Sequence, residues 1–204
     1  MKLARRLREL QEQSLATLSY IYLELIARTC IIRLDGEEKM VGDKIAGYWH
    51  GDSYSSQLLM RHMGRRHNKV TVLVTADRRG DYIERMLASY HGNVLRAHDG
   101  FGMKEVYREI IEYAKNEEGT FATSLDGPLG PYHEPKKLVF FLAEKAKKEM
   151  VFLQFNYSHC VTMKNRWDQY KIPLPFTKIT IRVNDLGMIT KKNLKEFKNL
   201  LQEF

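Results

Sequence analysis

The sequence predicts a single α/β domain, spanning residues 1–204, with a largely parallel central sheet flanked by helices. Short apolar runs alternate along the chain with longer segments that carry apolar residues at helical spacing. The length of 204 residues suits one domain with a sizeable core, and no segment resembles a linker, a repeat or a low-complexity tract. Hydrophobic residues form 44% of the sequence and charged residues 28%, which is typical of a folded chain.

The first predicted element is a helix over residues 3–28, with an α/β core over residues 29–204. The helix begins with several basic residues and leads into an apolar stretch over residues 15–34. Glu24, Arg28 and Arg33 interrupt that stretch, whereas a membrane span needs about 20 predominantly apolar residues. Two interpretations stay open: an amphipathic helix that dips into a lipid interface beside anionic headgroups, or a helix that only covers the sheet.

The core is predicted to alternate between strands and helices, which favours parallel strands with helices on both faces. Apolar and β-branched runs predict strands at residues 30–34, 44–49, 70–75, 94–97, 120–124, 150–157 and 178–183. Apolar residues at helical spacing predict helices at residues 53–63, 81–90, 103–115, 137–148 and 191–204.

The charge balance favours anionic partners. The formal net charge is +8, from 33 Lys and Arg against 25 Asp and Glu. Such a charge attracts nucleic acid, anionic lipid, the phosphates of coenzyme A or an acidic carrier protein. The basic residues are scattered, and no helix-turn-helix or zinc-finger spacing occurs, so nucleic acid is not expected as a partner. The two cysteines, Cys30 and Cys160, lie far apart, which favours a reducing compartment.

Two polar blocks each follow an apolar run that predicts a strand. One is Tyr48-Trp49-His50-Gly51, and the other extends from Ser124 to Pro131 with the sequence SLDGPLGP. In open α/β sheets, ligands bind outside the carboxyl ends of the strands. The two blocks are therefore the predicted functional site.

These blocks resemble the bacterial branch of the lysophospholipid acyltransferase superfamily that is defined by a domain of unknown function. In that branch a Trp-His-Gly block and an Asp-Gly-Pro-x-Gly-Pro block recur. The likeness extends over most of the chain, through five blocks in the same order. The other three blocks are residues 29–38, residues 72–81, and Trp167-Asp168 with residues 172–176.

The resemblance implies a glycerolipid-acyltransferase-like fold and transfer of a fatty acyl chain from a thioester to a lipid hydroxyl. The donor would be acyl-CoA or acyl carrier protein, with no permanently bound cofactor and no metal. The acceptor would be a lipid or lysolipid. The protein would be cytoplasmic and peripheral at the inner face of a membrane. A non-catalytic lipid-binding or acyl-carrier-binding protein on the same fold is the alternative.

His50 is the expected general base, because an imidazole titrates near the working pH and can take the hydroxyl proton. The wider superfamily has an acid five positions after this His, where the present chain has Ser55. Asp52, Ser55, Asp77 or Asp81 is expected to orient the ring instead. Asp168 is a further candidate for a supporting role near the site.

Asp126 is expected to position the acceptor, by a hydrogen bond to its hydroxyl or to His50. Leu129 stands where the branch commonly has Arg, so the phosphate of an acceptor would need another basic residue, with Arg78, Arg79, Arg96 and Lys136 as candidates. The remaining residues predicted to bind substrate are Trp49, Gly51, Gly127, Pro128 and Gly130. Backbone amides near Gly51 or Gly127 are candidates for stabilising an oxyanion.

Overall fold

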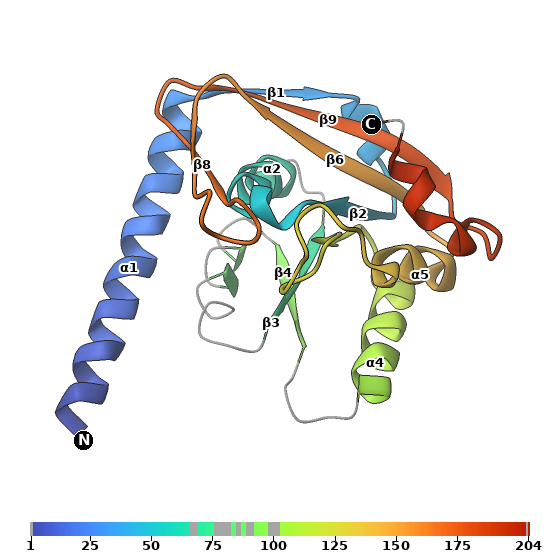
Figure 1. Cartoon of the computed structure of the whole chain (residues 1–204), viewed down its shortest axis with the longest axis horizontal. Helices are drawn as coiled ribbons and strands as arrows, with labels where there is room; N and C mark the ends of the chain where they lie inside the picture. Colours follow the sequence, from blue (N-terminus) through green and yellow to red (C-terminus); the bar gives the residue numbers. More distant parts are fainter. Residues whose placement is uncertain are drawn as a thin grey trace.

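The chain forms one seven-stranded sheet in the order β1-β9-β6-β2-β5-β3-β4, together with a two-stranded hairpin, β7–β8 (Figure 1). The computed structural model describes residues 2–65, 69–75, 83–84, 87–88, 92–97, 103–202 and 204. Neighbouring strands of the sheet are parallel except β6 and β9, which are antiparallel. The prediction of an α/β chain with a mostly parallel sheet flanked by helices is confirmed.

The elements have the following bounds. The strands are β1 (Ile31–Asp35), β2 (Lys44–Tyr48), β3 (Val70–Thr75), β4 (Asn93–Ala97), β5 (Thr120–Ser124), β6 (Glu149–Tyr157), β7 (Cys160–Thr162), β8 (Lys171–Pro173) and β9 (Lys178–Met188). The α-helices are α1 (Lys2–Thr29), α2 (Ser53–Arg65), α4 (Met103–Asn116) and α5 (Lys137–Ala146). The 3₁₀ helices are η1 (Glu37–Met40), η2 (His50–Asp52), η3 (Asn193–Lys195) and η4 (Phe197–Leu201).

The sheet separates two hydrophobic clusters, as the alternation of side chains along a strand requires. Along β6, Val151, Leu153 and Phe155 belong to the cluster that includes buried residues of α1 and α2. Met150 and Phe152 belong to the opposite cluster, which includes buried residues of α4 and α5. The core therefore has two layers, with β2 in the middle of the sheet and buried along its whole length.

The C-terminal half of α1 packs on α2. Leu23 and Ile26 are fully buried, and the Arg61 guanidinium on α2 donates two hydrogen bonds to the Glu24 carboxylate, at 2.9 and 2.8 Å. This half of the helix covers one face of the sheet. In the part of the chain that the structure describes, no helix combines the length and hydropathy that crossing a bilayer requires.

One prediction about secondary structure was wrong, and one element was missed. Within the predicted helix 191–204, the described residues form the short 3₁₀ helices η3 and η4 instead of one amphipathic helix. The Asn193 side chain accepts hydrogen bonds from the Thr190 amide and hydroxyl, which closes a local turn that competes with an α-helix. The hairpin β7–β8 was not predicted, because each of its strands has only three residues. The predicted helix 81–90 lies mostly outside the described residues.

Candidate active site

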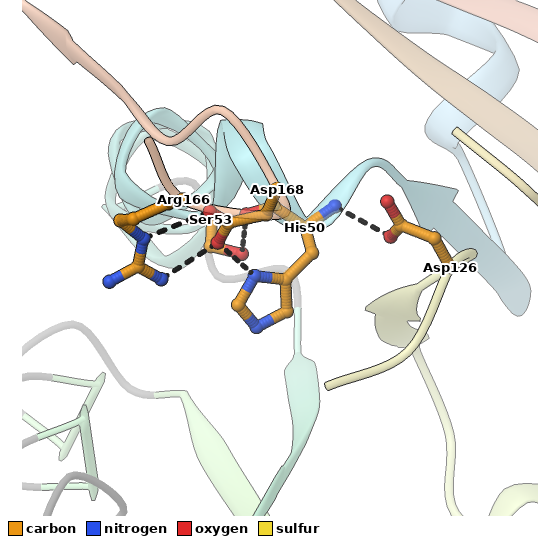
Figure 2. A network of polar contacts seen from close by, with 5 residues as sticks. All are labelled: His50, Ser53, Asp126, Arg166 and Asp168. Atoms are coloured by element: carbon orange, nitrogen blue, oxygen red, sulfur yellow. Dashed lines mark hydrogen bonds and ion pairs between the residues drawn. The ribbon is translucent and has the colours of Figure 1, made fainter. Parts of the chain in front are cut away.

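The carboxyl ends of β2 and β5 bring the two polar blocks together. These strands are parallel neighbours, with Tyr48 paired to Ser124 and the Leu125 amide donating to the Tyr48 carbonyl at 2.7 Å. His50 and Asp126 both lie two residues beyond this pair. The His50 amide donates to Asp126 Oδ1 at 2.8 Å (Figure 2). The predicted meeting of the two blocks at the sheet edge is thus observed.

The imidazole of His50 is held by Asp168. The distance from His50 Nδ1 to Asp168 Oδ2 is 2.8 Å, and the Asp168 side chain is fully buried. A carboxylate only accepts hydrogen bonds, so Nδ1 carries the proton and Nε2 of the neutral ring has a free lone pair. Figure 2 shows Nε2 pointing away from Asp168, and the His50 side chain is 27% exposed. No described residue contacts Nε2 through a hydrogen bond. This arrangement suits a general base.

Asp168 reaches His50 because residues 158–177, between β6 and β9, fold back over the end of β2. Gly51 and Gly130 allow this approach. A Cβ at Gly51 would lie 2.2 Å from the Asp168 carbonyl oxygen, and a Cβ at Gly130 would lie 2.4 Å from Trp167 Cε3. The Trp167 ring packs on the His50 ring with their centroids 5.1 Å apart. Both glycines are therefore needed for the Trp167-Asp168 pair to contact the His50 loop.

Arg166 is the second residue that binds the Asp168 carboxylate. Its Nε and Nη2 donate to the two oxygens of Asp168, at 2.9 and 2.8 Å (Figure 2). Its guanidinium lies over the Tyr170 ring. Burial alone would raise the pKa of Asp168, but the hydrogen bonds from Arg166 and His50 outweigh burial and lower the pKa to about 2. Asp168 is consequently ionised across the physiological range.

This depressed pKa predicts an acid dependence of stability. The unfolded-state pKa of Asp is about 3.9, so the stabilisation by ionised Asp168 is fully present above that value and is lost as pH falls through about 2. We expect the free energy of unfolding to fall more steeply between these values in the wild type than in Asp168→Asn. Urea unfolding at a series of pH values measures this difference. Equal dependence of the unfolding free energy on pH in the two proteins would contradict the low pKa of Asp168.

Asp126 anchors the backbone of the His50 loop. Its side chain is fully buried, and burial raises the pKa of the carboxyl group, although the hydrogen bond from the His50 amide partly opposes this rise. The structure brings Asp126 to the main chain of His50 and not to its ring. This geometry favours a role in positioning the loop, whereas direct contact with an acceptor stays a prediction.

Asp52 does not orient the ring, which corrects the expectation from its position two residues after His50. Asp52 is buried, and its Oδ1 accepts hydrogen bonds from the Tyr157 hydroxyl at 2.9 Å and from Lys171 Nζ at 3.0 Å. Ser55 is fully buried in α2 and lies beside Tyr157, so it does not replace the missing acid either. The Asp52–Tyr157–Lys171 cluster joins η2, β6 and β8 behind the site.

The Asp52–Lys171 ion pair predicts a coupled stability change. Lys171→Met leaves the Asp52 carboxylate buried without its cation, so we expect a loss of about 3 kcal/mol in the free energy of unfolding. The double variant Lys171→Met/Asp52→Asn should recover part of that loss, because it no longer has the uncompensated charge of the Asp52 carboxylate. A double-mutant cycle from urea unfolding measures the coupling. Strictly additive effects would show that the pair does not stabilise the fold.

The other predicted residues lie around this centre. Trp49 stacks on His133 with centroids 4.5 Å apart, and it packs edge-on against Phe152. Gly127 has a φ of +68°, in the left-handed region that favours glycine, while Leu129 is strongly exposed. Pro128 lies between them in the same exposed turn.

Arg96 lies on β4 and pairs with Glu84, away from the contacts that hold His50. Arg78, Arg79, Asp77 and Asp81 lie outside the described residues, so their expected roles stay predictions.

Sequence reasoning missed Arg166 and Lys171, and it gave Asp168 only a supporting part. The available signal was the Trp167-Asp168 block of the family resemblance, which lies 118 residues after His50 and so gives no local spacing that links it to the ring.

Comparison of the chain with models of protein families, with curated proteins and with solved structures found no match. The family resemblance therefore stays a prediction. Within the described residues, no group of three or more His, Cys, Asp and Glu side chains is arranged to hold a metal ion.

Proposed function

We propose that this chain is an O-acyltransferase that moves a fatty acyl chain from a thioester donor to a hydroxyl of a lipid or lysolipid acceptor. The observation that carries the proposal is the His50–Asp168 pair, with Nδ1 bound to a buried carboxylate and Nε2 free on a partly exposed ring. The pair lies at the carboxyl ends of β2 and β5, and open α/β sheets bind ligands at such strand ends.

The proposed reaction uses His50 Nε2 first as a base and then as an acid. Nε2 takes the proton of the acceptor hydroxyl as the oxygen attacks the thioester carbonyl carbon. The carbon–sulfur bond then breaks, and the departing thiolate takes the proton back from Nε2. The products are an ester and a free thiol, so the ring ends in its starting state.

Asp168 supports both steps of this reaction. Its carboxylate holds the ring in the tautomer that leaves Nε2 unprotonated, and it stabilises the imidazolium that forms in between. Arg166 keeps that carboxylate ionised and fixes its two oxygens. Asp126 fixes the His50 backbone, and amides near Gly51 or Gly127 are the candidates for binding the tetrahedral oxyanion.

The proposed partners follow from this chemistry. The donor is acyl-CoA or acyl carrier protein, and both are anionic, which suits the net charge of +8. The acceptor is an amphipathic alcohol, which is presented at a membrane surface. We accordingly propose a peripheral protein at the inner face of a membrane.

The test is release of free thiol from acyl-CoA and acyl-carrier-protein thioesters with a panel of lysolipid and glycolipid acceptors. We expect release that depends on the acceptor in the wild type and that is lost in His50→Ala and reduced in Asp126→Ala. Product analysis by mass spectrometry should show the acyl ester.

Two outcomes would overturn the proposal. Thiol release without any acceptor and without an ester product would indicate a thioesterase. Binding of acyl chains by a correctly folded protein with no release from any donor would favour the non-catalytic alternative.

A further inference from the structure

One corner of the molecule exposes large apolar side chains from three segments that are distant in the sequence. The segments are the C-terminal half of α1, the start of β1 and the loop after β8, which meet near the β8 label in Figure 1. We name this surface the apolar corner, and its residues are Leu18, Ile21, Leu25, Ile31, Leu174 and Phe176.

Hydrogen bonds hold these three segments side by side. The Tyr22 hydroxyl donates to the Pro173 carbonyl at 2.8 Å, which joins α1 to the end of β8. The Ile31 amide donates to the Thr177 carbonyl at 3.0 Å, and the Cys30 thiol contacts the Leu174 carbonyl at 3.3 Å. The exposed apolar residues therefore lie on one built surface instead of on separate loops.

Three exposed apolar residues form a stripe along α1, next to the contact of α1 with β8. Leu18, Ile21 and Leu25 are three and four positions apart and so lie along one side of the helix. Tyr22, which follows Ile21, contacts β8, so the stripe borders the loop that carries Leu174 and Phe176. The opposite side of the helix, with Leu23 and Ile26, is buried in the core.

Phe176 is the most exposed member of the corner. Its side chain is 82% exposed, and its φ of +63° lies in the left-handed region, which is costly for a residue with a Cβ. Hydrogen bonds from the Thr177 amide to the Leu174 carbonyl and from the Thr177 hydroxyl to the His159 carbonyl close the turn around it. The fold thus holds an aromatic ring in solvent at a cost in backbone energy.

The surroundings of the corner are cationic. Within residues 158–182, Arg166 and Lys171 pair with the buried Asp168 and Asp52, while the other three basic residues, Lys164, Lys178 and Arg182, are exposed. Arg28 and Arg33, at the end of α1 and in β1, have side chains that are 74% and 63% exposed, and they pair with Glu24 and Asp35, whose side chains are only 14% and 33% exposed. An apolar surface with a basic border is complementary to a membrane with anionic headgroups. A second copy of the chain would bring the same positive charge to the border and would be repelled.

We infer that the apolar corner inserts into the interface of an anionic lipid bilayer, with Phe176 and Leu174 entering the headgroup region and the basic border contacting lipid phosphates. The inference rests on the proposed function and deepens it by naming the surface that meets the lipid. It also moves the expected contact from the basic start of α1 to the end of that helix. Asp168 and Phe176 both belong to residues 158–177, the segment between β6 and β9. Docking would therefore bring the site to the bilayer surface.

Flotation of the full chain with lipid vesicles tests this inference. We expect binding to vesicles of phosphatidylcholine with phosphatidylglycerol, much weaker binding to phosphatidylcholine alone, and weakening by salt. The double variant Leu174→Ser/Phe176→Ser should lower the partition coefficient about tenfold, since two large apolar side chains no longer enter the interface. Both residues are exposed, so circular dichroism should show an unchanged fold.

The matched control is Val41→Ser/Met188→Ser, which removes two exposed apolar residues outside the corner and should leave binding unchanged. Equal binding by both double variants and the wild type would overturn the inference. Sedimentation that reveals a dimer dissociated by Leu174→Ser/Phe176→Ser would assign the corner to self-association and would also overturn it. His50→Ala should bind vesicles as the wild type does, so vesicle binding without thioester turnover would contradict the proposed function alone.

Discussion

Replacement of His50 by Ala is expected to lower kcat/KM for acyl transfer by about 10²–10⁴-fold, the usual contribution of a general base. The methyl group of Ala leaves no atom that can take the proton of the acceptor hydroxyl. The loss should fall on kcat, because the ring is partly exposed and the backbone contact of His50 with Asp126 remains available to Ala. Steady-state thiol release with a saturating donor measures the effect.

His159→Ala is the matched control for this substitution. His159 is exposed, and its ring contacts the neighbouring Ser158 hydroxyl. We expect full activity and an unchanged urea midpoint from this variant, and a native circular dichroism spectrum from both. If a folded His50→Ala protein retained turnover, His50 would not be the general base.

Replacement of Asp168 by Asn is expected to lower kcat by about 10²–10³-fold although the side chain keeps its shape. The amide of Asn can donate to Nδ1, which would place the ring proton on Nε2 and remove the free lone pair. The imidazolium would also lose its counter-charge. The rate should therefore fall at every pH.

Asp52→Asn separates this effect from a general loss of charge near the site. Asp52 is two residues from His50 but bonds Tyr157 and Lys171, so this variant should keep kcat within a few-fold of the wild type. The double variant His50→Ala/Asp168→Asn should be no slower than His50→Ala, because the two residues act as one unit. A larger loss from Asp52→Asn than from Asp168→Asn would reverse the assignment of the orienting acid.

Much of the architecture could be predicted from local patterns. The runs at Lys44–Tyr48 and Thr120–Ser124 are buried on both faces over almost their whole length, as is usual for central parallel strands, and both were predicted within a residue. Local patterns failed at residues 191–204 and at β7–β8 for different reasons. In the C-terminal segment, packing on the core and the Thr190–Asn193 hydrogen bonds override a weak periodic signal. The strands β7 and β8 have three residues each, which is too short for a periodic signal.

The sequence by itself determined the α/β class, the position of His50 after a buried strand and the pairing of its block with the Asp126 block. Strand and helix periodicity depend on residues close in sequence, so the alternation of elements can be read locally. Only the tertiary structure decided which acid serves His50. Asp52 is near in sequence, yet its carboxylate is bound by Lys171, whereas Asp168 arrives from 118 residues away because Gly51 leaves room for its backbone. A hydrogen bond needs its two atoms about 3 Å apart in space, however far apart the residues are in the sequence. The partner of the His50 ring could therefore be identified only from the folded structure.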